Sequence, residues 1–327
     1  MGRWLARRLI ITLITFIGIT MLVFALMRLA PVNPVDLLLF NMRNQGGLSS
    51  ADIQRIHDNL ARELGLDQPI PIQYLIWVQE VFTKGSLGFS FVFGRPSLTM
   101  VLERVPPTLI LMGTALTLEL LVGIPLGIIA ALRRNRITDY IVSTFGLSVV
   151  AVPSFFLGLA AIYVFSVKLN VLPAGGMFNP KNKGVDPIDF VRHLLMPAMI
   201  LGFAGVGPVI RYVRTSILET LGKEYLVTAR SKGLPRTLVI VRHAFPNALL
   251  PLITVIGLQV GTLMAGAFIT EQIFTWPGMG RLALDAINSR DYPVIQAFAV
   301  VTAIMVLLGN LLSDLAYGIA DPRIRLE

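Results

Sequence analysis

The sequence contains no cysteine and few charged residues. Without cysteine, the 327-residue chain can form neither disulfide bonds nor thiolate metal sites. Only 14% of its residues are Asp, Glu, Lys or Arg, whereas 54% are hydrophobic, and the mean hydropathy is +0.72. This composition is typical of a protein that crosses a membrane several times, and it excludes an ordinary soluble domain.

Motifs for bond-making chemistry are also missing. A phosphate-binding loop needs Gly, four residues, Gly, Lys and then Ser or Thr. The only Gly-Lys pair begins at Gly222, and Ile217 stands where the first Gly is required. We therefore expect no catalytic, cofactor-binding or metal-binding residue in this chain, and no ATP hydrolysis by it. An intramembrane protease using Ser148 or Ser154 is the alternative.

Long apolar runs are the main feature that is present. A helix rises 1.5 Å per residue, so about 20 residues are needed to cross roughly 30 Å of hydrocarbon. We therefore predict an all-α membrane protein with six transmembrane helices. The predicted spans are residues 9–30, 106–132, 137–168, 194–217, 247–270 and 293–318.

The spans divide the chain into three predicted parts. Residues 1–30 hold the N-terminus and the first helix, and residues 31–105 form a small extracytoplasmic cap. Residues 106–327 form a five-helix core that includes a cytoplasmic loop at 218–246. Within the cap, Ser50 is expected to begin a helix that ends at Gly65, and a second short helix is expected around Tyr74, Leu75, Trp77, Val78 and Val81.

Basic residues indicate the orientation. Short loops rich in Lys and Arg stay in the cytoplasm, and here they all fall on one side of the predicted spans. They comprise Arg3, Arg7 and Arg8, then Arg133, Arg134 and Arg136, then the loop around Gly233, and finally Arg323 and Arg325. We therefore predict a multi-pass protein of the cytoplasmic membrane with both termini in the cytoplasm. The net charge of +9 reflects this bias and not a nucleic-acid partner.

The cytoplasmic loop contains the segment EYLVTARSKGLP at residues 224–235. Its Arg and Lys residues exclude it from lipid, because each costs roughly 2.5–3.5 kcal/mol at the centre of a span. We predict a helix of about two turns followed by a hinge at Gly233. Its apolar side chains, Leu226, Val227 and Ala229, can fill a groove in a soluble partner. A helix lying on anionic lipid is the alternative.

Two other features have open interpretations. Glu119 lies near the middle of the second span, where a carboxylate is either a pathway or proton-relay group or a structural tie between helices. The sequence favours the structural role.

The segment EQIFTWPGMGRLALDAINSRD at residues 271–291 lies on the outer side. Phe274 and Trp276 suit a membrane interface, and Pro277, Gly278 and Gly280 predict a re-entrant or tight turn before a short amphipathic helix. This segment is either part of an outer gate or binding-protein contact, or a loop that packs on the bundle.

Blocks of sequence in a fixed order resemble the first permease of peptide/nickel-type ABC importers, which carry dipeptides and oligopeptides. They are RRLIITLITFIGITMLVFALMRLAPVNPVD, LARELGLDQPIPIQYLIWV with GSLGFSF, GIPLGIIAALRRN, EYLVTARSKGLP with RHAFPNALLP, GTLMAGAFITEQIFTWPGMGRLALDAINSRDYPVIQ and DPRIR. The resemblance implies a type I importer permease that forms half of a translocation pathway for di- or oligopeptides. A permease for nickel or another small solute is the alternative, and a proton-coupled secondary transporter is a further one.

The resemblance also implies the partners. These are a second homologous permease, two ABC ATPase subunits that bind ATP and Mg²⁺ in place of this chain, an extracytoplasmic substrate-binding protein and membrane lipid. It further implies that the cytoplasmic loop couples to the ATPases. The expected coupling residues are Glu224, Tyr225, Thr228, Ala229, Arg230, Lys232, Gly233, Leu234 and Pro235.

Overall fold

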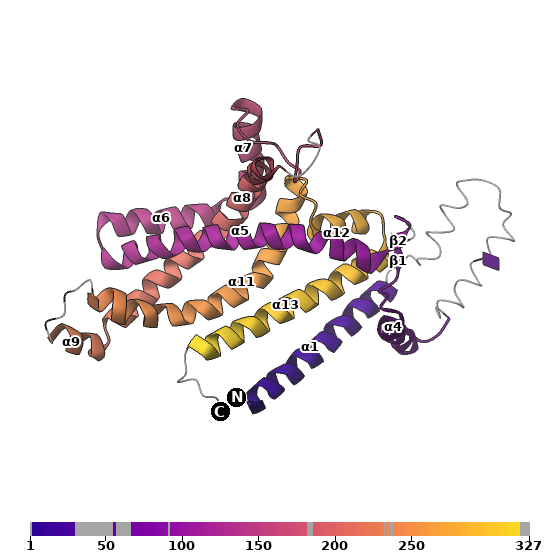
Figure 1. Ribbon diagram of the computed structural model, residues 1–327, viewed down its shortest axis with the longest axis horizontal. Coiled ribbons are helices and arrows are strands. Elements are labelled where there is room, and N and C mark those ends of the chain that lie inside the picture. The colour runs from indigo at the N-terminus through magenta and orange to yellow at the C-terminus, as the bar shows by residue number, and fades with distance from the viewer. Residues whose placement is uncertain are drawn as a thin grey trace. The chain divides into compact units, whose positions relative to one another are not determined.

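The computed structural model describes residues 2–29, 55–56, 67–90, 92–181, 186–231, 233, 235 and 238–320. Most of these residues are helical (Figure 1). They form two compact units. The core unit comprises Pro106–Arg281 and the chain from Leu308 onward, and the N-terminal unit comprises Gly2–Val105 and Leu282–Leu307.

The helices and strands follow one another along the chain as Figure 1 labels them. They are α1 (Gly2–Arg28), α4 (Ile70–Lys84), β1 (Phe89–Ser90), β2 (Arg95–Pro96), α5 (Ser97–Leu132), α6 (Ile137–Ala151), α7 (Ser154–Ala161), the π-helix η1 (Ile162–Lys168), α8 (Pro187–Leu221), α9 (Glu224–Ser231), the π-helix η2 (Val239–Ala244), α11 (Phe245–Ile273), α12 (Met279–Asn288) and α13 (Tyr292–Ala320). The two short strands pair antiparallel.

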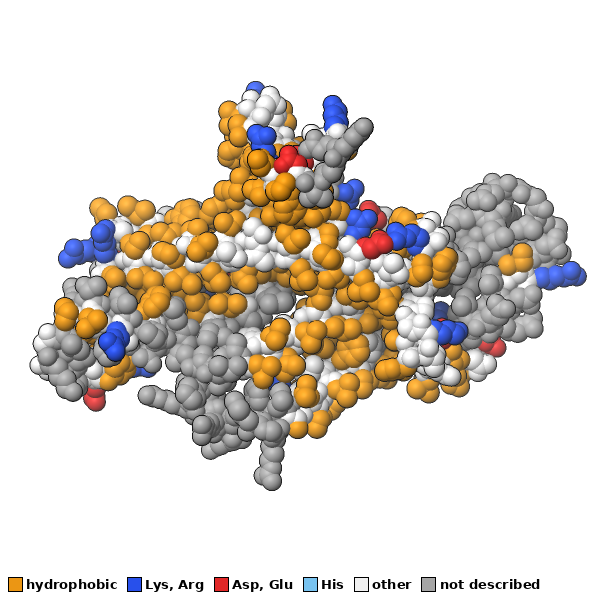
Figure 2. Space-filling model, in the orientation of Figure 1, with side chains coloured by type: hydrophobic (Ala, Val, Ile, Leu, Met, Phe, Trp, Pro, Cys, Tyr) orange, Lys and Arg blue, Asp and Glu red, His pale blue; other side chains and the backbone are white. Residues whose placement is uncertain are grey.

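Each predicted span coincides with helix in the structure. Four helices of the described chain, α1, α5, α8 and α13, contain segments long and apolar enough to cross a membrane, and α6 with α7 and η1 makes a fifth if the bent pair counts as one span. The predicted span at 247–270 lies inside the 29-residue α11. Hydrophobic side chains cover much of the visible helix surface, and Lys and Arg gather near helix ends (Figure 2). The predicted all-α membrane fold is therefore confirmed.

The third predicted span is not one straight helix. The chain bends by 92° between α6 and the helix that begins at Ser154. Pro153 explains the break, because a proline forces the preceding residue away from helical geometry, and Val152 is extended (φ −95°, ψ 127°). Pro125 and Pro208, by contrast, lie inside unbroken helices. A proline in the sequence therefore marks a possible break, and packing decides whether it occurs.

Small residues let α5 and α8 approach closely in the core unit. A Cβ atom added to Gly123 would lie 2.7 Å from a Val209 methyl carbon, and one added to Gly202 would lie 2.6 Å from the carbonyl oxygen of Ala115. Such contacts are usual where membrane helices pack backbone to backbone. Nearer the loop that contains α9, helices α5, α8 and α11 share an apolar cluster of Ala131, Val209, Val213, Ile217, Ala248 and Leu252.

An ion pair fixes the same end of the core unit. Arg214 donates from Nε and Nη2 to the two carboxylate oxygens of Asp139, at 2.7 and 2.8 Å. The backbone N–H of Asn135 donates to the same carboxylate at 2.9 Å. The two-pronged pairing of Arg with a carboxylate is strongly directional. It therefore sets the start of α6 level with the C-terminal part of α8.

The N-terminal unit contains the second helix expected in the cap. Tyr74 and Trp77 of α4 stack against Phe24 of α1, with ring centroids 5.6 and 5.8 Å from that of Phe24. The hydroxyl groups of Thr20 and Tyr74 share a hydrogen bond of 3.0 Å. The other helix expected in the cap, from Ser50 to Gly65, lies outside the described residues apart from positions 55 and 56.

Candidate functional site

The predicted coupling loop begins directly after α8. The backbone N–H of Lys223 donates to the carbonyl of Thr220 at 3.0 Å, so the chain turns tightly into α9. After α9, Gly233 has φ +77°, in the left-handed region that favours glycine. A Cβ atom added there would meet no atom within 4 Å. The position predicted as a hinge is therefore an exposed turn with a backbone that other residues adopt only with strain.

One expectation for this loop is wrong. Leu226 was expected to enter a groove in a partner, but its side chain is fully buried within this chain. It packs against Val239 of η2 and Leu221 of α8. This contact joins α9 to the helices on either side. It also removes the apolar side chain of Leu226 from water, which stabilises the packing.

The remaining coupling residues divide into two groups. Glu224, Tyr225, Gly233 and Pro235 are exposed. The other members lie outside what the structure describes, either as side chains or entirely; they are Thr228, Ala229, Arg230, Lys232 and Leu234.

At the opposite end of the core unit, the loop after α11 packs tightly onto the bundle. Phe274 and Trp276 are 1% and 0% exposed, so neither ring lies in an exposed interfacial belt. The indole of Trp276 donates to the carbonyl of Pro107 at 2.9 Å. The carbonyl of Phe274 accepts from the backbone N–H of Gly176 at 2.8 Å. Aromatic burial with the polar N–H satisfied is a stable anchoring arrangement.

The tight turn expected at Pro277, Gly278 and Gly280 is present. Thr275 has φ +47°, and the N–H of Gly278 donates to the carbonyl of Trp276 at 2.8 Å. The short helix α12 follows, from Met279. Gly278 has to be glycine, because a Cβ atom there would collide with the carboxylate of Glu271.

Glu271 organises this loop, and the sequence reasoning did not single it out. Its Oε1 accepts from the hydroxyl of Thr108 at 2.6 Å. Its Oε2 accepts from the backbone N–H groups of Gly280 and Arg281 at 2.7 and 3.1 Å. A carboxylate that accepts the first N–H groups of a helix stabilises that helix. The available signal was an acidic residue at the end of an apolar run, shortly before a Pro-Gly turn.

Glu119 is buried where three helices of the core unit meet. Its side chain on α5 is 0% exposed and accepts a hydrogen bond from the amide of Gln259 on α11. Gly205 on α8 lies against the carboxylate, where a Cβ atom would collide with it. In the described part of the chain, Oε2 of Glu119 has no hydrogen-bond partner. A neutral carboxyl group suits this position, because an unpaired charge inside a membrane protein is costly.

We predict that Glu119→Gln leaves the assembly and activity of the protein close to wild type, because an amide reproduces the shape and one hydrogen bond of a neutral carboxyl group. Glu119→Ala should instead reduce the amount of assembled protein, since it leaves a cavity and an unpaired amide at Gln259, at a cost of about 2–4 kcal/mol. Activity per assembled protein is the measurement. Loss of activity in a fully assembled Gln variant would assign Glu119 to a proton relay or pathway.

These features define a class of protein before any relative is considered. Long apolar helices form the core unit, with an exposed turn after α8 at one end and a closely packed loop after α11 at the other. Among the described residues, no three His, Asp or Glu side chains gather closely enough to hold a metal ion. The long apolar helices make the chain an integral membrane protein.

The chain belongs to the family described as binding-protein-dependent transport system inner membrane component. Residues 123–326 match that family, and residues 1–112 match its N-terminal part. The chain is 41% identical to the dipeptide transport system permease protein DppB of Escherichia coli (strain K12) and 37% identical to the oligopeptide transport system permease protein AppB of Bacillus subtilis (strain 168). In both comparisons 99% of each chain is covered.

Solved structures show the same fold. An inward-facing structure of the MetNI methionine ABC transporter matches with a TM-score of 0.56 at 16% identity, covering 68% of this chain and 96% of that one. The sequence-based resemblance to importer permeases is thus confirmed.

Proposed function

We propose that this chain is one of two permease subunits that together form the translocation pathway of an ATP-driven importer for di- or oligopeptides. The observation that supports this most is similarity along the whole chain to permeases named for dipeptide and oligopeptide transport. A second permease, two ATPase subunits and an extracytoplasmic binding protein complete the complex. ATP and Mg²⁺ bind to the ATPase subunits and not to this chain.

The cytoplasmic loop couples ATPase motion to the bundle. The exposed residues Glu224, Tyr225, Gly233 and Pro235 form the docking surface, together with Thr228, Ala229, Arg230, Lys232 and Leu234. The buried contact of Leu226 with Val239 holds α9 on the chain segments that continue into α8 and α11. A rigid link of this kind transmits a displacement of α9 to α8 and α11, because close-packed side chains resist compression. Closure of the ATPases then moves α8 and α11 together.

The outer loop provides the opposite gate. Phe274, Trp276, Pro277, Gly278 and Gly280 shape this loop, and their packing supports a rigid element that opens and closes as a unit. The exposed residues around it contact the binding protein. Glu119 acts as a structural tie between α5, α8 and α11.

Reconstitution of the complete complex tests this function. Proteoliposomes containing the purified complex and its binding protein should take up a labelled series of alanyl peptides, two to five residues long, only when ATP is enclosed with the ATPases. A protonophore should leave this uptake unchanged. Uptake that needs a proton gradient and no ATP would identify a secondary transporter, and ATP-dependent uptake of nickel alone would identify the nickel alternative.

The proposed orientation places both termini and the basic loops in the cytoplasm. We predict that a cysteine introduced at Lys84 or Lys181 reacts with an impermeant thiol reagent in intact cells, whereas one at Arg134 reacts only after lysis. All three side chains are exposed in this chain, and the absence of native cysteine removes background labelling. Mass shifts on gels measure the labelling. Reaction at position 134 in intact cells would reverse the orientation.

A further inference from the structure

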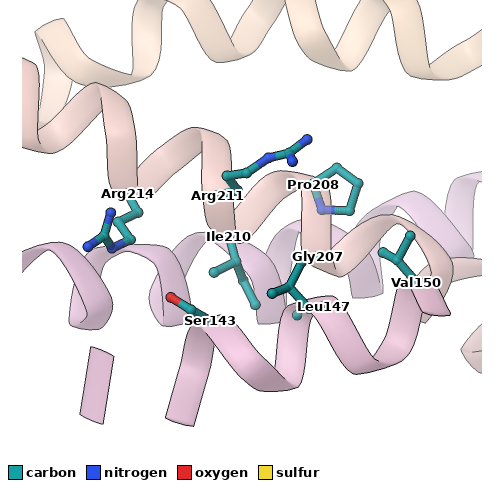
Figure 3. Close-up of a pocket in the computed structure, with 9 residues that line it drawn as sticks. Ser143, Leu147, Val150, Gly207, Pro208, Ile210, Arg211 and Arg214 are labelled. Atoms are coloured by element: carbon teal, nitrogen blue, oxygen red, sulfur yellow. The ribbon is translucent and has the colours of Figure 1, made fainter. Parts of the chain in front are cut away.

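A groove opens between α6 and α8 in the core unit (Figure 3). The helices touch at Gly146 and Gly207, where a Cβ atom on Gly207 would collide with the carbonyl of Gly146. The groove beside this contact has a volume of about 220 Å³. Its walls are one face of α6, from Ser143 to Val150, and one face of α8, from Gly207 to Arg214.

Two arginines line this groove, and they differ in their surroundings. Arg214 is paired with the carboxylate of Asp139. Arg211 is exposed, and within the described chain it makes no hydrogen bond or ion pair. An arginine remains charged at all relevant pH values and carries five N–H donors. Arg211 therefore presents an unused cation on the surface of a membrane-spanning helix.

The side chain of Arg211 points along α8 toward the N-terminus of that helix. Figure 3 shows it extending toward Pro208, which is the direction of the N-terminus of α8, and away from Arg214. Arg214 is level with the start of α6, so Arg211, three residues earlier in α8, lies about 4.5 Å farther from that end. An arginine that reached for lipid headgroups would extend the other way, toward the α5–α6 turn. The orientation of Arg211 thus favours a polar environment within the membrane.

The part of α8 around Arg211 has the character of a water-facing surface, in contrast to the N-terminal half of α8, which exposes Ile188, Val191 and Leu195. Around Arg211 the exposed residues are Ala204, Pro208 and Thr215, which are small or polar. Most exposed residues of α1 are by contrast large and aliphatic; they include Leu9, Ile10, Ile14 and Leu22.

Pro208 adds a second polar group to this face. It has no N–H, so the carbonyl of Ala204 lacks its usual helical donor, and inside a membrane that carbonyl needs water or another donor.

We propose that the groove between α6 and α8 lines the translocation pathway and that Arg211 binds the C-terminal carboxylate of a peptide in transit. This inference rests on the proposed function and adds to it a site and a recognised chemical group. The guanidinium of Arg211 matches a carboxylate in planar geometry and charge. Leu147 and Val150 provide an apolar wall beside it, which suits side chains of varied sequence because apolar contact is not directional.

The test uses the whole complex in proteoliposomes with saturating binding protein. The variants are Arg211→Gln and Arg211→Lys, and Arg134→Gln is the matched control, because Arg134 is an exposed arginine outside the groove. Labelled dialanine and its C-terminal amide are the probes, and binding-protein affinity for each probe is measured separately. Arg211→Gln should slow dialanine uptake about tenfold or more, as expected for loss of a charge-assisted hydrogen bond. Arg211→Lys should retain most of the rate, and Arg134→Gln all of it.

The preference for the free acid over the amide separates a binding role from a structural one. In the wild type this preference should exceed that of the binding protein alone, and in Arg211→Gln it should fall to the binding protein's value. An unchanged preference would overturn the proposal. So would a defect that disappears in liposomes of neutral phosphatidylcholine, which would assign Arg211 to anionic lipid, or reduced recovery of the second permease, which would assign it to a subunit contact. If the wild type transports no peptide, the proposed function itself fails.

Discussion

Gly233→Leu is expected to abolish peptide uptake while leaving the amount of protein in the membrane unchanged. The backbone at Gly233 has φ +77°, and a residue with a Cβ atom pays roughly 1–2 kcal/mol to adopt it. No atom of this chain lies within 4 Å of the added Cβ, so the leucine projects from the surface. Against a packed ATPase it would cost a further 1–3 kcal/mol or so through overpacking. Membrane insertion should be unaffected, because the loop lies outside the hydrocarbon.

Purification through a tagged ATPase measures this effect. Recovery of the permease and peptide-stimulated ATP hydrolysis should both fall in Gly233→Leu. Gly222→Ala is the matched control: Gly222 has φ −82°, and its added Cβ would lie 3.6 Å from the nearest atom, an ordinary contact. Gly233→Asn should be intermediate, since asparagine tolerates the left-handed region. Normal recovery of the permease and normal peptide-stimulated ATP hydrolysis in Gly233→Leu would contradict ATPase docking. The alternative, that the loop lies on anionic lipid, would then hold.

Glu271→Ala is expected to destabilise the outer loop and to stop uptake. The substitution removes the acceptor of three donors, the hydroxyl of Thr108 and the N–H groups of Gly280 and Arg281. A buried donor left without an acceptor costs about 1–3 kcal/mol, so the combined loss is several kcal/mol and leaves α12 without its N-terminal acceptor. We expect a fall of several degrees in the thermal midpoint of the purified complex and little uptake by the protein that remains.

Two variants define the cause of this loss. Asp285→Ala removes an exposed carboxylate from the same helix, α12, and should change stability by no more than about 0.5 kcal/mol. Glu271→Gln should be intermediate, because an amide keeps one acceptor oxygen and replaces the other with a donor. Wild-type stability of Glu271→Ala would show that the loop is held by aromatic packing alone.

Positions of helices were predictable because the hydrophobic run that forms a span is a local property of the chain. The length and composition of the apolar runs predicted helices at the positions of α1, α5, α8, α11 and α13. The turn at Gly233 and the turn before α12 were expected for an equally local reason, since Gly and Pro restrict or release the backbone where they occur. The family was indicated by blocks of sequence in a fixed order, which relatives along the whole chain confirm.

Tertiary structure decided which of these local possibilities are used. Pro153 breaks its helix and Pro208 does not. Leu226 and Trp276 are buried, where the sequence had suggested a partner surface and an interfacial belt.

Pairing between residues far apart in the chain could not be predicted from the sequence either, because it depends on tertiary packing. Thr108 and Glu271 are 163 positions apart, and Asp139 and Arg214 are 75 apart. Arg211 and Arg214 are equivalent as residues in a sequence, yet of these two only Arg214 is paired with a carboxylate among the described residues. The chain by itself therefore determined where helices and turns form, because those depend on neighbouring residues. Only folding decided which polar groups are paired within the described chain and which, like Arg211, are exposed, because that depends on which helices pack together.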